Sequence, residues 1–162
     1  MSMEDHPKQI IEQTEITNLL IRYFAAIDDK QLNEKIVGAT FTSDAQIIKP
    51  NGAISAGHEN ILKDQLKSFA RFKATHHATS DYIIDIENDT ASIRTNLTAM
   101  HLWADNEENP FLNGKHFHAG GVLNTKAIKI EGKWKINEWI FRVVWRTGEG
   151  IHEMAKFARP KN

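Results

Sequence analysis

Apolar residues recur at helical spacing in the first part of the chain. Between residues 8 and 27 they fall three or four positions apart, which predicts an amphipathic helix with one face turned toward a core. The inward stripe consists of Ile16, Leu20, Tyr23, Phe24 and Ile27. Two further helices and two short strands are predicted next, the helices over 30–37 and 58–72 and the strands over 45–49 and 53–56. Asn51-Gly52 is a strong signal for a hairpin between these strands.

From Thr75 onward the chain has the alternating pattern of long β-strands. Four are predicted, covering 76–87, 90–104, 115–130 and 133–146, and a short helical pattern follows over 151–157. Helices followed by antiparallel strands indicate an α+β fold in one domain, residues 1–162. In the last strand the apolar positions change parity between Ile136 and Trp139. We therefore expect a bulged, curved sheet that wraps around the helices or packs its outer face on a partner subunit.

Composition excludes several classes of site. The 162 residues include no cysteine, which excludes disulfides, thiol catalysis, zinc–thiolate sites and iron–sulfur clusters. With 20 Lys and Arg against 21 Asp and Glu, the net charge is −1, so we expect no nucleic-acid partner. The sequence shows neither a leader pattern nor an apolar stretch of membrane-spanning length, and we expect a cytoplasmic protein.

His101 is the histidine whose placement is clearest. Its odd-numbered neighbours in the strand over 90–104 are mostly apolar, so a period of two turns His101 toward the core. A buried imidazole must satisfy its ring nitrogens. One interpretation is therefore a structural core histidine, and the other is a site residue.

His76 and His77 leave two alternatives open. The parity of Tyr82 and Ile84, continued backwards, turns His76 inward, whereas a bulge between Ala78 and Ser80 would turn His77 inward instead.

Asp28 closes the apolar stripe of the first helix. A carboxylate at a helix C-terminus opposes the macrodipole, which favours a specific partner for Asp28 over a merely solvated turn residue. A histidine with a carboxylate behind it forms a general acid–base pair. His116 and His118 share a strand face and could bind a metal with His76 or His77. No carboxylate lies at ligand spacing beside them, so we expect no metal or other cofactor.

Three segments together resemble the SnoaL-like branch of the nuclear-transport-factor-two-like superfamily. They are residues 24–28, residues 75–81 with the turn at 88–89, and residues 132–136 with Trp145. The resemblance implies a cone-shaped, curved antiparallel sheet around helices with an internal apolar pocket. The nearest functional likeness is to scytalone dehydratase and hexachlorocyclohexane dehydrochlorinase, in which an aspartate ending the first helix pairs with a strand histidine.

Residue by residue, this likeness implies Asp28 and His77 as the catalytic pair, with a bulge in the strand, and His101 as a second site histidine. We expect the substrate pocket to be lined by Tyr23, Phe24, Ile27, Trp103, Phe117 and Trp139, and the segment 148–162 to cover it. The chain departs from scytalone dehydratase at its tyrosines, since Ile27 precedes Asp28 and the strand over 45–49 has none. Asp81 also replaces the asparagine of that family.

The resulting hypothesis is a cofactor-free lyase or isomerase acting on a small apolar, cyclic molecule. In it His77 abstracts a proton, Asp28 orients His77, and His101 donates to or polarises the leaving group or carbonyl. The alternatives are a non-catalytic small-molecule-binding or accessory module and a structural subunit, because one fold hosts many functions. A sheet that is apolar on both faces also predicts a homodimer or homotrimer.

Overall fold

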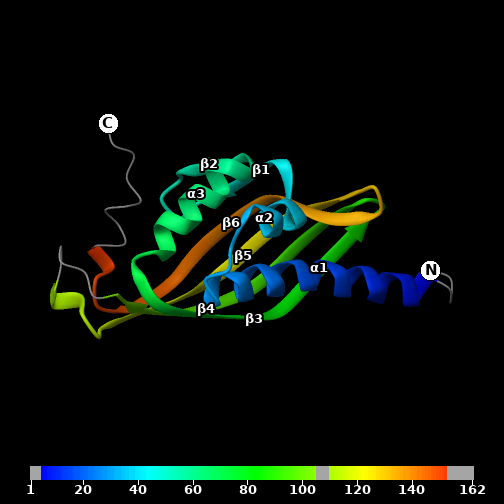
Figure 1. The fold of residues 1–162 in the computed structure, drawn as a ribbon. Helices are drawn as coiled ribbons and strands as arrows, with labels where there is room; N and C mark the ends of the chain where they lie inside the picture. The colour runs from blue at the N-terminus through cyan, green and yellow to red at the C-terminus, as the bar shows by residue number, and fades with distance from the viewer. Residues whose placement is uncertain (1–4, 105–109, 153–162) are drawn as a thin grey trace.

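The computed structural model describes residues 5–104 and 110–152 (Figure 1). The elements along the chain are α1 (Asp5–Asp28), α2 (Glu34–Thr40), β1 (Phe41–Ile48), β2 (Ile54–Ala56), α3 (Gly57–Phe69), β3 (Phe72–Glu87), β4 (Thr90–Trp103), η1 (Pro110–Leu112), β5 (His116–Ile130) and β6 (Lys133–Gly148). Helices come first and long strands afterwards, so the predicted α+β class is confirmed.

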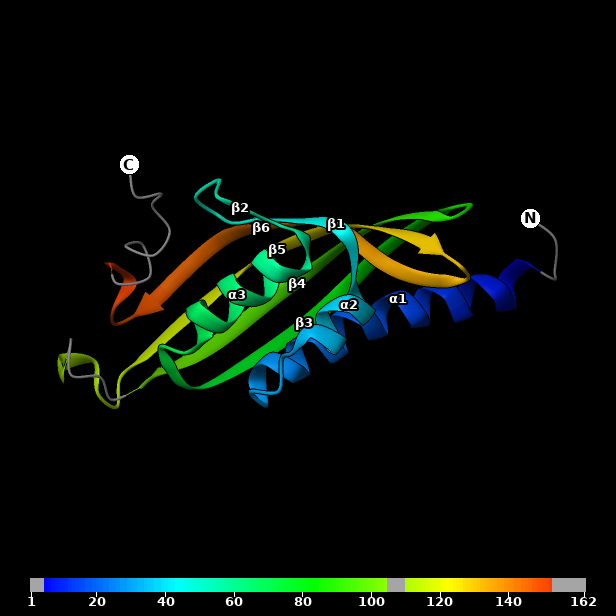
Figure 2. The same cartoon turned by 45° about the horizontal axis from the view of Figure 1, so that its top comes forward.

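The six strands form one open, curved sheet in the order β2-β1-β6-β5-β4-β3. Neighbouring strands are antiparallel except for β1 and β6, which run parallel. The predicted antiparallel meander is therefore right for β3 to β6, whereas β1 joins it from a distant part of the chain. All three helices lie on the concave face of the sheet (Figure 2), and α1 packs mainly on β3.

The predicted boundaries of the second and third helices are wrong at one or both ends. α2 begins at Glu34 rather than at residue 30, because the Asn33 side chain caps it by accepting a hydrogen bond from the Ile36 amide. It runs through Gly38 instead of ending there. α3 stops at Phe69, and Phe72 already pairs with Trp103 in the sheet.

Two register shifts in β6 explain its change of parity. Asn137 is an extra residue opposite β5, and it moves the buried side of the strand from Ile136 to Trp139. Val144 is extra in the same way at the second shift. Beyond it Trp145 lies on the outer face, 42% exposed, beside the His118 ring.

Buried side chains form two clusters. The larger lies between the helices and the sheet and includes the α1 stripe, with Leu20 and Tyr23 fully buried. The smaller lies at one end of the sheet and contains Phe72, Trp103, Leu112, Phe117 and Ala119, with Phe69 and Ile151 packed against it. Of the predicted pocket cover, residues 148–152 are described and Glu149 accepts a hydrogen bond from Trp103; residues 153–162 lie outside the described residues.

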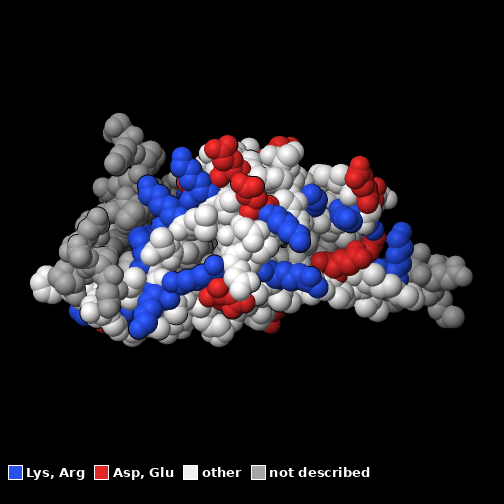
Figure 3. Space-filling model, viewed as in Figure 1, with Lys and Arg blue, Asp and Glu red and all other residues white. Residues whose placement is uncertain are grey.

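The surface carries charges of both signs. On the helix-bearing face, Lys and Arg are interspersed with Asp and Glu (Figure 3). Within the described part of the chain, no helix has the length and apolarity needed to cross a membrane.

A bulge in β3 decides which side chains of that strand face inward. The pairing with β4 shifts between Ser80 and Ile83, and Asp81 in the shift has a positive φ of 54°. Its carboxylate accepts hydrogen bonds from Ser80 and Asn96. Because of the shift, His77 on one side of the bulge and Ile84 on the other both turn toward the helices.

We predict that Asp81→Val lowers the free energy of unfolding by about 1–2 kcal/mol, because a β-branched residue resists the left-handed backbone region. Asp81→Asn should be nearly neutral, since asparagine tolerates that region and keeps an acceptor oxygen. Urea unfolding of both variants measures the difference, and equal stabilities would contradict the role assigned to the bulge.

Candidate functional site

Asp28, the last residue of α1, is held by donors on β3. Its carboxylate accepts hydrogen bonds from Nδ1 of His77 at 2.6 Å, from the His77 backbone amide at 2.8 Å and from the Thr75 hydroxyl at 2.7 Å. Burial raises the pKa of the Asp28 carboxyl, but the hydrogen bonds from His77 and Thr75 and the attraction to His77 lower it. The net effect holds this pKa below its usual value.

The His77 imidazole lies inside the molecule, with only 4% of its side chain exposed. Phe24 stacks on it at a centroid distance of 4.9 Å, and Phe69 meets it edge-on at 5.5 Å. The hydrogen bond to Asp28 uses Nδ1 and leaves Nε2 available. A carboxylate can only accept in this bond, so the partner assigns the proton to Nδ1 and a lone pair to Nε2 of the neutral ring.

His101 faces the same interior from β4, as its parity predicts. It is buried, and its ring meets the His77 ring edge-on with 5.6 Å between centroids. Nδ1 lies 3.3 Å from the Phe117 carbonyl oxygen. Burial, with a smaller contribution from His77, lowers the pKa of His101 to about 4, so this imidazole is neutral at pH 7.

The residues predicted to line a pocket are all buried: Tyr23, Phe24, Ile27, Trp103, Phe117 and Trp139. They do not form one set. Phe24 and Phe117 contact the imidazoles, and Trp139 packs on Phe24 at 5.4 Å. Trp103 belongs instead to the smaller cluster, where it packs on Phe72.

Tyr23 packs against Trp139, with 5.5 Å between the ring centroids. Its hydroxyl is buried and has no hydrogen-bond partner among the described residues, and burial raises its pKa above the ordinary value. Ile27 packs in the larger cluster.

Aromatic rings surround the two imidazoles. Three surface grooves of the described residues have volumes of about 730, 200 and 290 Å³, and neither Asp28, His77 nor His101 lines any of them. In the described ranges 5–104 and 110–152, no group of three His, Asp or Glu side chains is placed to hold a metal ion. A histidine that is hydrogen-bonded to a carboxylate is an arrangement that can transfer a proton.

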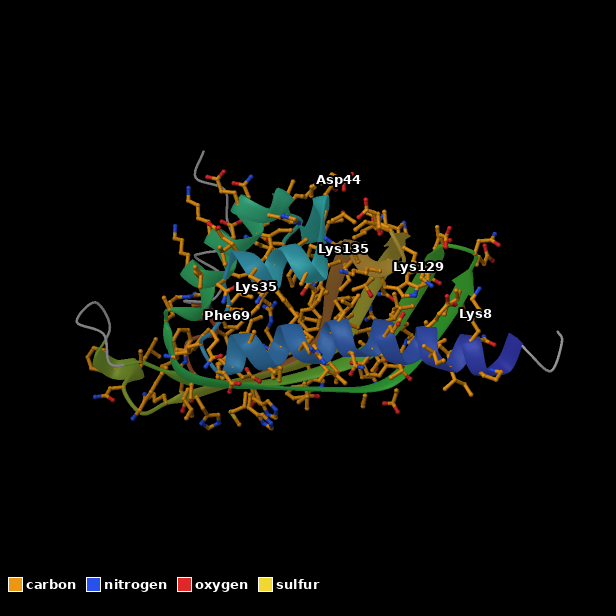
Figure 4. All side chains as sticks on the ribbon, turned by 45° about the vertical axis from the view of Figure 1, so that its right-hand side comes forward. Lys8, Lys35, Asp44, Phe69, Lys129 and Lys135 are labelled. Atoms are coloured by element: carbon orange, nitrogen blue, oxygen red, sulfur yellow. The ribbon has the colours of Figure 1, made fainter. Side chains whose placement is uncertain are left out.

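Sequence reasoning missed Thr75, Phe69 and Phe72 as parts of this site. Thr75 could have been found from His77, because residues two apart on a strand share a face. Phe69 ends α3 and lies between that helix and the sheet (Figure 4). Its place beside the histidines depends on where α3 stops, as does that of Phe72, which packs on His101 at 4.7 Å.

Solved structures share this architecture. A protein from Kribbella flavida superposes with a TM-score of 0.79 at 19% identity, covering 91% of this chain and 99% of the other. A putative scytalone dehydratase from Novosphingobium aromaticivorans gives a TM-score of 0.77 at 18% identity, covering 90% and 93%. The LinA-type3 hexachlorocyclohexane dehydrochlorinase from Novosphingobium barchaimii gives 0.74 at 15% identity, covering 88% and 94%.

At these identities the likenesses show the fold. A search of curated protein sequences finds no match. The sequence model of the SnoaL-like domain, in contrast, matches residues 8–140, which contain both the helices and most of the sheet. The segments 24–28 and 75–81, with the turn at 88–89, which carry the resemblance in the sequence, lie within that match. The chain belongs to the SnoaL-like domain family.

Proposed function

We propose that this protein is a cofactor-free acid–base enzyme, a lyase of the dehydratase type or an isomerase, acting on a small apolar, cyclic molecule. The observation that carries the proposal is the 2.6 Å hydrogen bond between Asp28 and Nδ1 of His77, which leaves Nε2 available inside an aromatic interior. Heavy-atom contacts of 2.6–3.2 Å are what proton transfer between positioned groups requires.

In the proposed reaction Nε2 of His77 takes a proton from a carbon of the substrate. The Asp28 carboxylate stabilises the imidazolium that forms, because a negative charge next to it offsets the new positive charge. In a lyase the electron pair of the broken C–H bond forms a C=C bond and expels the leaving group from the neighbouring carbon. In an isomerase His77 returns the proton to a different carbon.

The geometry changes the role expected for His101. A ring that is neutral at pH 7 and whose Nδ1 faces the Phe117 carbonyl carries its proton on Nδ1, so Nε2 accepts hydrogen bonds. We therefore assign His101 to accepting a hydrogen bond from a substrate hydroxyl, which orients the molecule over His77. This differs from the role predicted from the sequence, which is to donate to or polarise the leaving group or carbonyl.

The surroundings support an apolar substrate. Rings of Phe24, Phe69, Phe72 and Phe117 contact one or both imidazoles at centroid distances between 4.7 and 6.3 Å. Two of the structural neighbours carry names that denote eliminations, a putative scytalone dehydratase and a dehydrochlorinase.

We also propose a homodimer or homotrimer formed through the outer face of the sheet. That face exposes Ile83 and Leu102, with exposed fractions of 54% and 41%. Exposed apolar side chains on one face are typical of protein interfaces.

The test of the catalytic role compares two adjacent histidines. His77→Ala should lower the rate of proton transfer by about 10²–10⁴-fold, the usual contribution of a general base. His76→Ala is the matched control and should keep the full rate, because His76 is exposed on the other side of β3. Deuterium exchange in D₂O, followed by NMR over a panel of small cyclic ketones and β-hydroxy ketones, measures proton abstraction.

Asp28→Asn should lose rate in the same assay, while circular dichroism shows an unchanged fold. Full exchange in His77→Ala would refute the acid–base role. Tight binding of a panel compound that is released unchanged by the wild type and both variants would instead identify a non-catalytic binding module.

A second prediction concerns pH and stability. The pKa of His101 is about 4 in the folded protein and about 6.5 in the unfolded chain, so the unfolded chain binds the proton first as the pH falls. The free energy of unfolding should therefore decrease between pH 6.5 and 4, by up to about 3 kcal/mol from this residue.

Replacing the imidazole by His101→Phe removes that contribution, so the stability of the variant should depend less on pH in this window. Urea unfolding followed by tryptophan fluorescence at pH 7 and pH 4.5 measures both proteins. An equal decrease in the two proteins would show that folding does not lower the pKa of His101.

A further inference from the structure

One edge of β6 has no neighbouring strand over its second half. β5 pairs with β6 as far as Gly148, but the pairing of β1 on the other side ends at Ile140. In Figure 2, β6 runs on past the β1–β2 hairpin. Within the described residues, the backbone groups of 141–147 on that side therefore meet no strand, over a length of about 23 Å.

The β1–β2 hairpin explains why β1 leaves β6. Lys49 pairs its amide with the Ala53 carbonyl, and Gly52 donates to the Lys49 carbonyl, so the chain turns back on itself. Pro50 in this turn has no N–H to donate to a sheet. The hairpin tip closes one end of a groove of about 730 Å³, lined by Lys49, Pro50, Gly52 and residues 140–146.

The groove combines apolar and basic side chains. Val144 and Trp145 are 58% and 42% exposed. Arg142 and Arg146 are also exposed, and neither forms an ion pair with a carboxylate of the described residues. Lys49 pairs with Asp64 at 2.9 Å, and the lining itself contains no acidic residue. An extended segment bound here would meet apolar surface and two guanidinium groups that pair with no carboxylate of the described residues.

A second copy of this chain fits the edge poorly. Two β6 edges related by a two-fold axis would bring the same arginines, Arg142 and Arg146, together along the shared strand pair. Like charges opposite one another are destabilising, and charged side chains on an edge strand oppose self-association.

We propose that the β6 edge between Phe141 and Thr147 binds an extended, acidic segment of a partner protein by strand addition. Backbone hydrogen bonds to this edge supply the part of the affinity that does not depend on the sequence of the segment, as in other β-augmentation sites. Arg142 pairs with Val122 and Arg146 with Ala119, so the two arginines lie on opposite faces of β6. Carboxylates on both faces of the segment pair with them, and its apolar residues cover Val144 and Trp145. This surface is separate from Asp28 and His77, so the inference does not depend on the proposed function.

The experiment uses the full-length protein and three fluorescein-labelled eight-residue peptides. One, the Glu–Val peptide, repeats Glu-Glu-Val-Val, so that carboxylates lie on both faces of the strand. A second repeats Lys-Lys-Val-Val, and the third is the Glu–Val peptide with N-methyl groups on alternate residues, which removes its strand hydrogen bonds. Fluorescence anisotropy at physiological salt measures binding. Amide hydrogen exchange locates the binding site.

We expect the Glu–Val peptide to bind, the other two peptides to bind at least tenfold more weakly, and exchange of amides within 141–147 to slow. The double variant Arg142→Glu/Arg146→Glu should weaken the Glu–Val peptide by about tenfold or more, from two lost cross-strand charge pairs. Lys8→Glu/Lys35→Glu is the matched control, because it makes the same change in net charge at two exposed lysines outside the groove (Figure 4).

Four results would overturn the proposal. These are no binding of the Glu–Val peptide, equal binding of the N-methylated peptide, an equal loss in the two double variants, and slow exchange at 141–147 without peptide in a self-associated protein. The last result would assign the edge to a second copy of this chain.

Discussion

The arrangement of the site depends on the hydrogen bonds that the Asp28 carboxylate accepts. It lies at a helix C-terminus, where the helix dipole disfavours a negative charge. Three donors from β3 surround it, two of them from His77 and the third from Thr75. These bonds tie the end of α1 to the sheet, and they also fix the orientation and the tautomer of the His77 ring. The same three hydrogen bonds thus attach α1 to the sheet and orient the His77 ring.

The second histidine owes its state to the surrounding rings. Phe72 and Phe117 pack on His101 and keep water away, which disfavours the charged imidazolium. His101 therefore differs from His77 although their rings are in contact. One imidazole has a carboxylate beside it and the other has a backbone carbonyl. In the proposed reaction, this difference in partners makes His77 the base and His101 a neutral hydrogen-bonding group.

Local sequence patterns were sufficient for the parts of the site that depend on periodicity. The α1 stripe with Asp28 at its end and the inward direction of His101 both follow from the spacing of apolar residues. The direction of His77 required more, because it depends on the positive φ of Asp81 in the β3 bulge. The parallel pairing of β1 with β6 joins segments far apart in sequence, so no local pattern predicts it. The aromatic surroundings of the histidines also depend on tertiary packing, since Phe69 reaches His77 from the end of α3.

The most direct test of the account is the tautomer of His77 in the wild-type protein. Long-range ¹H–¹⁵N NMR at pH 8 distinguishes a ring nitrogen that carries a proton from one that carries a lone pair. The hydrogen bond to Asp28 predicts the proton on Nδ1 and the lone pair on Nε2. A proton on Nε2 would contradict the account, because the nitrogen available to a substrate could then not act as a base.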